Sequence, residues 1–279
     1  MNSKLPLLGA LWLAISIPLS ADTLLSYGGD YISDSVVSFS RSATSSGSGP
    51  YTYTLNYDLD EVLSPSSNYT GPVFYGGYQF SSSTVDGQFS RQQIRNSDPL
   101  DRIYLQTYSP TGWDGSTLSL HAAFLFKQED FLPGYQSGAN LIEGLSMSSN
   151  SFGAGTGRFL VEVGGSFYVS NSTMNVSGTT SLVLDAAALS TETWAAYDPF
   201  TSLNFDQNSS FGALALENVT GAGFYVERDS FAGSAATTPF GMGIETFEVV
   251  GITVPEPSVY ALLLGAVVLG GALMRRRYR

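Results

Sequence analysis

Residues 157–171 read GRFLVEVGGSFYVSN, and this stretch decides the fold class. Apolar side chains alternate with other residues over positions 159–163 and again over 167–169, with Gly164-Gly165 between the two runs. A period of two is typical of a strand with one buried face, and a two-residue Gly-Gly loop suits a tight hairpin turn. We therefore predict a β-hairpin over residues 157–171.

The same pattern continues on both sides of this hairpin. Short runs rich in Val, Tyr, Phe and Leu are separated by Gly, Ser, Asn and Pro. Further strands are expected at residues 102–108, 118–127, 141–147, 181–184, 221–227 and 244–250. Helical turns are expected only near residues 191–196. The sequence thus predicts an all-β protein, a single β-sandwich or jelly roll over residues 22–253.

The first 21 residues have the composition of a secretory signal peptide. Lys4 precedes an apolar run over residues 5–19, and small residues follow before Asp22. The alternative is a buried N-terminal helix, which Pro6 and Pro18 disfavour. We therefore predict a signal helix at residues 1–21 that export removes.

The last 26 residues form three consecutive parts. The tripeptide Pro255-Glu256-Pro257 is followed by an apolar stretch over residues 259–274. The basic residues at the end are Arg275, Arg276, Arg277 and Arg279. Sixteen helical residues span about 24 Å, slightly less than a ~30 Å hydrocarbon core, and long arginine side chains can make up the difference. By the positive-inside rule the predicted transmembrane helix places the preceding domain outside. A permanent single-pass anchor and a last core helix are the alternatives.

This tail resembles the PEP-CTERM sorting signal through its three parts in this order. The resemblance implies processing by exosortase, a membrane-embedded protease-transpeptidase that acts beside Pro255, Glu256 and Pro257. It also implies that residues 254–279 hold the domain transiently on the periplasmic side of the inner membrane. The domain then reaches the cell surface or an extracellular polysaccharide matrix.

A looser resemblance concerns the domain itself. Residues 223–226 (GFYV) and 246–249 (TFEV) are similar to the last strands of jelly-roll, galactose-binding-like domains. Such a likeness supports the fold class and leaves the function to be argued from a site.

Charge and cysteine content exclude several classes of protein. The net charge is −12, and five of the 12 basic residues lie in the two ends. Seven basic residues against 23 acidic ones give the domain about −16. Such a charge disfavours nucleic acid and anionic lipid surfaces as partners. Because the chain has no cysteine, disulfides, thiolate metal sites and cysteine nucleophiles are absent.

An enzyme would need catalytic groups that the sequence does not offer in a recognisable pattern. His121 is the single histidine, in an expected strand, where we predict that it pairs with a hydroxyl or carbonyl group. No Gly-x-Ser-x-Gly elbow accompanies it. Trp194 and Tyr197 are expected to pack in or beside the core. We therefore predict no catalytic site, no metal site and no cofactor.

Three alternatives remain open. Asp58 and Asp60 lie on one face of a strand-like run and could serve a glycosidase, or hold Ca²⁺ with oxygens from other loops. Trp113 and Asp114 lie in the turn-like stretch TGWDG, where an indole could stack on a sugar ring and a carboxylate accept its hydroxyls. The main hypothesis is an exported structural or interaction protein, and the alternative is a surface carbohydrate-binding module around Trp113.

Overall fold

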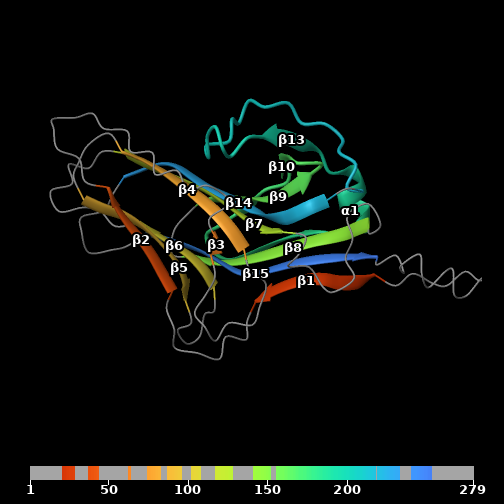
Figure 1. The fold of residues 1–279 in the computed structure, drawn as a ribbon, viewed down its shortest axis with the longest axis horizontal. Helices are drawn as coiled ribbons and strands as arrows, with labels where there is room; N and C mark the ends of the chain where they lie inside the picture. The colour runs from red at the N-terminus through yellow and green to blue at the C-terminus, as the bar shows by residue number, and fades with distance from the viewer. Residues whose placement is uncertain are drawn as a thin grey trace, which may run out of the picture.

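The computed structural model describes residues 21–28, 37–43, 62–63, 74–82, 87–95, 102–107, 117–127, 141–151, 155–217, 219–232 and 240–252. In this part of the chain two antiparallel sheets face each other (Figure 1). The predicted all-β, two-sheet sandwich is confirmed.

Within the described residues, sheet A has seven strands. Its order is β12 (Gly178–Leu184), β8 (Leu141–Ser151), β15 (Phe240–Ile252), β6 (Arg102–Thr107), β5 (Gly87–Arg95) and β2 (Val37–Ala43), with β1 (Asp22–Gly28) also paired to β15. Sheet B has eight. Its order is β13 (Trp194–Tyr197), β10 (Ser166–Ser170), β9 (Thr156–Val163), β14 (Val219–Ala232), β7 (Thr117–Lys127), β4 (Phe74–Ser82) and β3 (Val62–Leu63), with β11 (Met174–Asn175) also paired to β9.

The predicted hairpin is present as β9 and β10. Val163 pairs with Ser166, and the two glycines between them have φ angles of 59° and 79°. Positive φ at both central residues is the geometry that a two-residue hairpin turn with right-handed strand twist requires. The six other predicted strands are all found, as β6, β7, β8, β12, β14 and β15, most of them longer than predicted.

The short helix predicted near residues 191–196 is present but shifted, and residues 194–197 form a strand instead. The helix α1 lies earlier, at Ala186–Thr191, where the Asp185 carboxylate caps it by accepting a 2.8 Å hydrogen bond from the Ala188 amide. Trp194 and Tyr197 instead begin and end strand β13, since they pair with Ser170 and Phe167 of β10. A distant partner strand thus decides the conformation of these residues.

The core between the sheets, here the inner cluster, is rich in phenylalanine. Phe247 of β15 stacks on Phe126 of β7 with ring centroids 5.4 Å apart, and it also contacts Phe159 and Phe224 of sheet B. All four rings are fully buried. Alternation along β7, β9, β14 and β15 supplies these inward side chains.

Sheet B is also covered on its other face over β7, β9, β10, β13 and β14. Ala123, Leu125, Leu160 and Tyr225 belong to a second apolar cluster, the outer cluster, which also contains Leu203 and Phe205 from the connection between β13 and β14. Figure 1 shows this connection arching over β13, β10 and β9, on the side away from β8 and β15. Residues 198–211 of the connection are named the cover below.

The two extremes of the described fold lie together. Asp22, the first residue of β1, pairs with Gly251, and Ile252, the last residue of β15, pairs with Leu141 (Figure 1). At the other end of β15, Phe240 pairs with Thr107. The predicted signal helix and transmembrane helix fall outside the described residues. Among the residues that are described, none belongs to a helix long and apolar enough to cross a bilayer.

Candidate functional site

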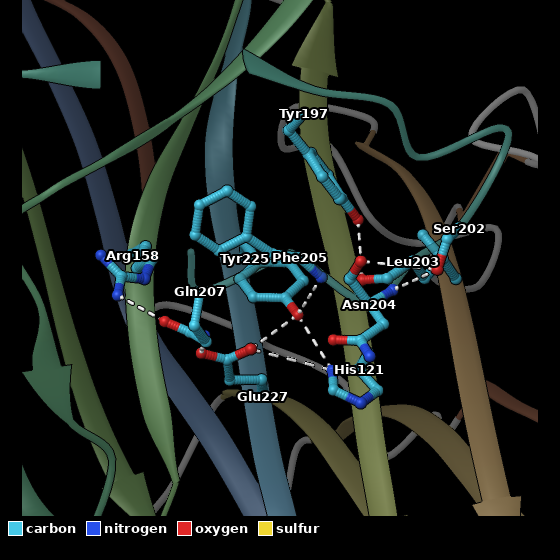
Figure 2. Close-up of polar contacts among 10 residues, drawn as sticks. All are labelled: His121, Arg158, Tyr197, Ser202, Leu203, Asn204, Phe205, Gln207, Tyr225 and Glu227. Atoms are coloured by element: carbon cyan, nitrogen blue, oxygen red, sulfur yellow. Dashed lines mark hydrogen bonds and ion pairs between the residues drawn. The ribbon is translucent and has the colours of Figure 1, made fainter. Parts of the chain in front are cut away.

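A polar cluster lies between sheet B and the cover (Figure 2). His121 of β7, Arg158 of β9 and Glu227 of β14 are only 3 %, 8 % and 4 % exposed. Tyr225 of β14 and Gln207 of the cover complete the cluster. The strand register brings them together, because Tyr225 pairs with Arg158 and Glu227 pairs with His121.

The Glu227 carboxylate is the centre of this cluster. The Tyr225 hydroxyl donates to Glu227 Oε2 over 2.8 Å, and the Gln207 side-chain amide donates to Oε1. His121 Nδ1 lies 2.9 Å from the Tyr225 hydroxyl and 3.8 Å from Glu227 Oε2. Buried carboxylates are strongly destabilising unless such donors surround them, so these contacts account for a charge at this depth.

The contacts of Tyr225 fix where the protons lie. Its oxygen accepts a 3.1 Å hydrogen bond from the Phe205 backbone N–H, and its single proton goes to Glu227. His121 must then donate from Nδ1 to the Tyr225 oxygen for the 2.9 Å contact to be a hydrogen bond. We assign His121 an Nδ1–H proton and Glu227 the ionised form on this basis.

Arg158 links the cover to the end of β10. Its Nη1 donates to the backbone carbonyls of Ser170 (2.8 Å) and Asn171 (2.9 Å), and its Nη2 donates to Gln207 Oε1 (3.1 Å). The guanidinium also lies 5.5 Å from the centre of the Phe205 ring. Gln207 therefore joins a buried cation to a buried anion, accepting from Arg158 and donating to Glu227.

Burial shifts the protonation equilibria of the cluster. Desolvation lowers the pKa of Arg158 from its usual 12.5, while the negative charge of Glu227 acts in the opposite direction. Desolvation and the Glu227 charge raise the pKa of Tyr225 well above its usual 10. The pKa of Tyr197, which donates to the Leu203 carbonyl over 3.0 Å, is raised for the same two reasons. Both tyrosines are thus neutral near pH ~7.

This arrangement works as a tether. The Tyr225 hydroxyl, the Glu227 carboxylate, the Gln207 amide and both terminal nitrogens of Arg158 bond to one another or to backbone of the cover and of residues 170–171. Arg158 Nε is buried and has no hydrogen-bond partner among the described residues. His121 is a strand histidine bonded to a hydroxyl, as predicted, and it is nearly inaccessible. Within the described ranges, no group of three or more His, Asp or Glu side chains is placed to hold a metal ion.

The residues singled out from the sequence fall into two groups. Trp194 and Tyr197 are buried, as predicted, with 3 % and 7 % exposure. The others lie outside the described residues: Asp58, Asp60, Trp113, Asp114, Pro255, Glu256, Pro257, Arg275, Arg276, Arg277 and Arg279.

The sequence patterns did not point to Arg158, Gln207, Tyr225 or Glu227. A signal for part of this cluster exists in residues 122–126 (AAFLF) and 221–226 (GAGFYV), which are apolar without a period of two. Continuous apolar runs are typical of strands covered on both faces. A polar residue directly beside such a run, as His121 and Glu227 are, must then find a buried partner.

Comparison with known proteins gives one distant similarity. No protein-family model matches the chain. No curated protein sequence matches it either. A family 11 carbohydrate-binding module, from the cellulosomal cellulase Lic26A-Cel5E of Clostridium thermocellum, is similar in structure with 8 % identity and a TM-score of 0.33, over 84 % of this chain and 95 % of that module. No residue of the site is assigned from this similarity. The PEP-CTERM and jelly-roll resemblances stay predictions.

Proposed function

We propose that this chain is an exported, non-catalytic structural or interaction protein of the cell surface or extracellular matrix, carried to the membrane by its tail. The observation that carries the proposal is the pairing of Asp22 with Gly251. β1 begins at the first residue after the predicted leader, and β15 ends three residues before Pro255. A leader and a tail attached at these points leave the sandwich from the same end.

This geometry suits a protein that is processed at both ends. Leader and tail can lie in one membrane at the same time without stretching the domain between them. The β1–β15 ladder, from Asp22 to Gly28, lies wholly between the two predicted cleavage regions. Cleavage at either side therefore leaves every hydrogen bond of this ladder in place. His121, buried and bonded to Tyr225, supports a role without catalysis.

The test is an intact-mass measurement on protein from its native host. We expect a chain that has lost residues 1–21 and the residues beyond the Pro-Glu-Pro tripeptide. Glu256→Ala is expected to retain the tail, whereas Glu217→Ala, an exposed glutamate on the described surface, is processed normally. A mature chain that keeps residues 258–279 would instead establish a permanent anchor. Full-length chain recovered from the cytosol with both ends present would overturn the proposal.

Carbohydrate binding around Trp113 and Asp114 is a second candidate, supported by where their connection is attached. β6 ends at Thr107, which pairs with Phe240, and β7 begins at Thr117, which pairs with Ala232. These strand ends belong to the end of the sandwich opposite Asp22 and Ile252 (Figure 1). A ligand held there would face away from a membrane-bound tail.

Affinity gel electrophoresis with soluble polysaccharides of the host matrix tests this second function. Trp113→Ala is expected to abolish the retardation, because the stacking of a sugar ring on the indole would be lost. The matched control is Phe200→Ala, which removes a 54 % exposed aromatic ring from a different loop. Equal retardation of the parent protein and Trp113→Ala, or none with any polysaccharide, would exclude this site.

A further inference from the structure

The cover is a loop whose neck is closed by a backbone pairing with the first residue of β13. Trp194 and Gly212 exchange two backbone hydrogen bonds, of 2.8 and 2.9 Å, so the residues flanking the cover are held together. The cover between them spans residues 198–211, the size of a compact Ω-loop. Leu214 and Leu216, beyond the neck, pack with the inner cluster, whereas Leu203, Phe205 and Phe211 of the cover pack with the outer cluster.

The cover also carries internal structure of its own. The Asp198 carboxylate accepts from the Phe200 and Thr201 amides and from the Thr201 hydroxyl, and the Ser202 amide donates to the Asp198 carbonyl. A second turn is closed by the Ser209 amide and the Asp206 carbonyl. These bonds need no partner in sheet B, so they persist when the cover moves.

Side-chain hydrogen bonds and the apolar contacts of the outer cluster join the described residues of the cover to sheet B. The Phe205 amide donates to the Tyr225 hydroxyl, Leu203 accepts from Tyr197, and Gln207 bridges Arg158 and Glu227. None of these is part of a strand ladder. Segments held by side chains instead of ladders open at lower free energy than the strands around them.

We propose that the cover is a hinged unit that leaves the outer face of sheet B while its neck and both sheets stay folded, with the Glu227 carboxylate as an acid-sensitive catch. Opening exposes Leu125, Leu160 and Tyr225 beside the charges of Arg158 and Glu227. The inner cluster contains no residue of the cover and is unaffected.

The direction of the pH effect follows from the groups around Glu227. These are His121 on β7, Arg158 on β9, Tyr197 on β13 and Tyr225 on its own strand. Protonation of Glu227 removes its attraction to Arg158 and weakens the bonds from Gln207 and Tyr225. Protonation of His121 would favour ionised Glu227, 3.8 Å away, and so opposes opening. Within this polar cluster, acid-induced opening therefore requires protonation of Glu227 itself.

Hydrogen exchange of the full chain, read by mass spectrometry, tests the proposal. At pH ~7 the cover is expected to exchange faster than β8 and β15, and lowering the pH to ~4 is expected to increase its opening, corrected for intrinsic exchange, by at least about tenfold. The neck at Trp194 and Gly212 stays protected throughout. Exchange of the cover only together with β8 and β15, at either pH, would overturn the proposal.

Two variants and one control separate the catch from general destabilisation. Gln207→Ala, at an exposed position of the cover, is expected to raise opening of the cover about tenfold near pH ~7 and to leave β8 unchanged. Glu227→Gln keeps the shape and removes the titration, so its opening no longer depends on pH. Ser210→Ala, also exposed on the cover, behaves as the parent protein.

An unchanged pH dependence in a folded Glu227→Gln protein would exclude Glu227 as the catch. If that variant does not fold, hydrogen exchange of the parent protein across the pH series and of Gln207→Ala still tests whether the cover opens on its own.

Discussion

Over β7, β9 and β14 both faces of sheet B are buried, but by different means. The inner face packs against sheet A through rings such as Phe124, Phe159 and Phe224, all supplied by strands. The outer face packs against a loop and includes a carboxylate, a guanidinium and an imidazole side by side. Strand alternation supplies most of the first layer. The second layer forms only when a segment with no ladder of its own docks through specific side-chain contacts.

Truncation in the inner layer is expected to have the largest effect. Phe247→Ala removes a fully buried ring that contacts Phe126, Phe159 and Phe224. We expect a loss of about 3–5 kcal/mol in the free energy of unfolding, measured by urea denaturation followed by circular dichroism.

The matched truncation in the outer layer is Phe205→Ala. This ring is 2 % exposed and contacts Tyr197, Phe211 and Tyr225. Because the cover can leave the sheet on its own, the loss is limited to the free energy that closes the cover. A loss in Phe205→Ala equal to that in Phe247→Ala would show that the two layers unfold as one.

Removal of the buried cation is expected to have the next largest effect. Arg158→Met leaves Glu227 without its nearby positive charge and leaves the carbonyls of Ser170 and Asn171 without their donor. A loss of about 3 kcal/mol is expected by urea denaturation. The double variant Arg158→Met with Glu227→Gln should lose less than the sum of the single variants, since neither charge is then left alone. Strict additivity would contradict the coupling.

Alkaline pH sharpens the comparison, because the outer layer contains two tyrosines with raised pKa values. The pKa values of Tyr197 and Tyr225 are higher in the folded protein than the ~10 of an unfolded chain. The neutral tyrosines contribute fully to the free energy of unfolding below pH ~10. As the pH rises above this value, the free energy of unfolding falls by about 1.4 kcal/mol per pH unit for each tyrosine. Urea unfolding above pH ~10 measures the slope of the free energy of unfolding against pH. Tyr225→Phe should reduce this slope, because one of the two tyrosines no longer titrates. An identical slope in that variant would contradict the assignment.

The hairpin turn offers the smallest effect, one that both layers share. Gly164 has a φ of 59° and open space around an added Cβ atom, so Gly164→Ala is strained only in its backbone. We expect a loss of about 1 kcal/mol in the free energy of unfolding. Gly164→Asn, which tolerates this conformation better, should lose less. Because side chains of β9 belong to both clusters, Gly164→Ala should lower the stability of both layers. An increase in hydrogen exchange limited to the cover would contradict this expectation.

The inner and outer layers also differ in how well the sequence predicts them. The strands of the inner layer are predictable because alternation, as in residues 157–171, records which side chains face a core. Residues 194–197 (WAAY) mark the limit of this predictability. Their strand forms by pairing with β10, which ends 24 residues before Trp194. Local propensity favours a helix for such an alanine-rich stretch, and tertiary pairing overrides it.

The polar cluster was not predictable from the same pattern. Arg158 and Glu227 each occupy a position where a strand of a sandwich would show a polar residue to solvent. Their burial depends on the cover, and residues 203–207 (LNFDQ) give no sign of the sheet on which they lie. The apolar runs at 122–126 and 221–226 reveal that something covers sheet B. They do not reveal which segment it is.

The length and pairing of β15 have a mechanical consequence. Its 13 residues extend about 44 Å, and one of its edges is shared by β6 and β1, which follow one another along it. Tension applied beyond Ile252 runs along the strand axis, perpendicular to the hydrogen bonds that join β15 to β8 and β1. These bonds are then loaded in shear, all at once, instead of being unzipped one by one. The strand nearest the tail is thus the one best able to resist being pulled out.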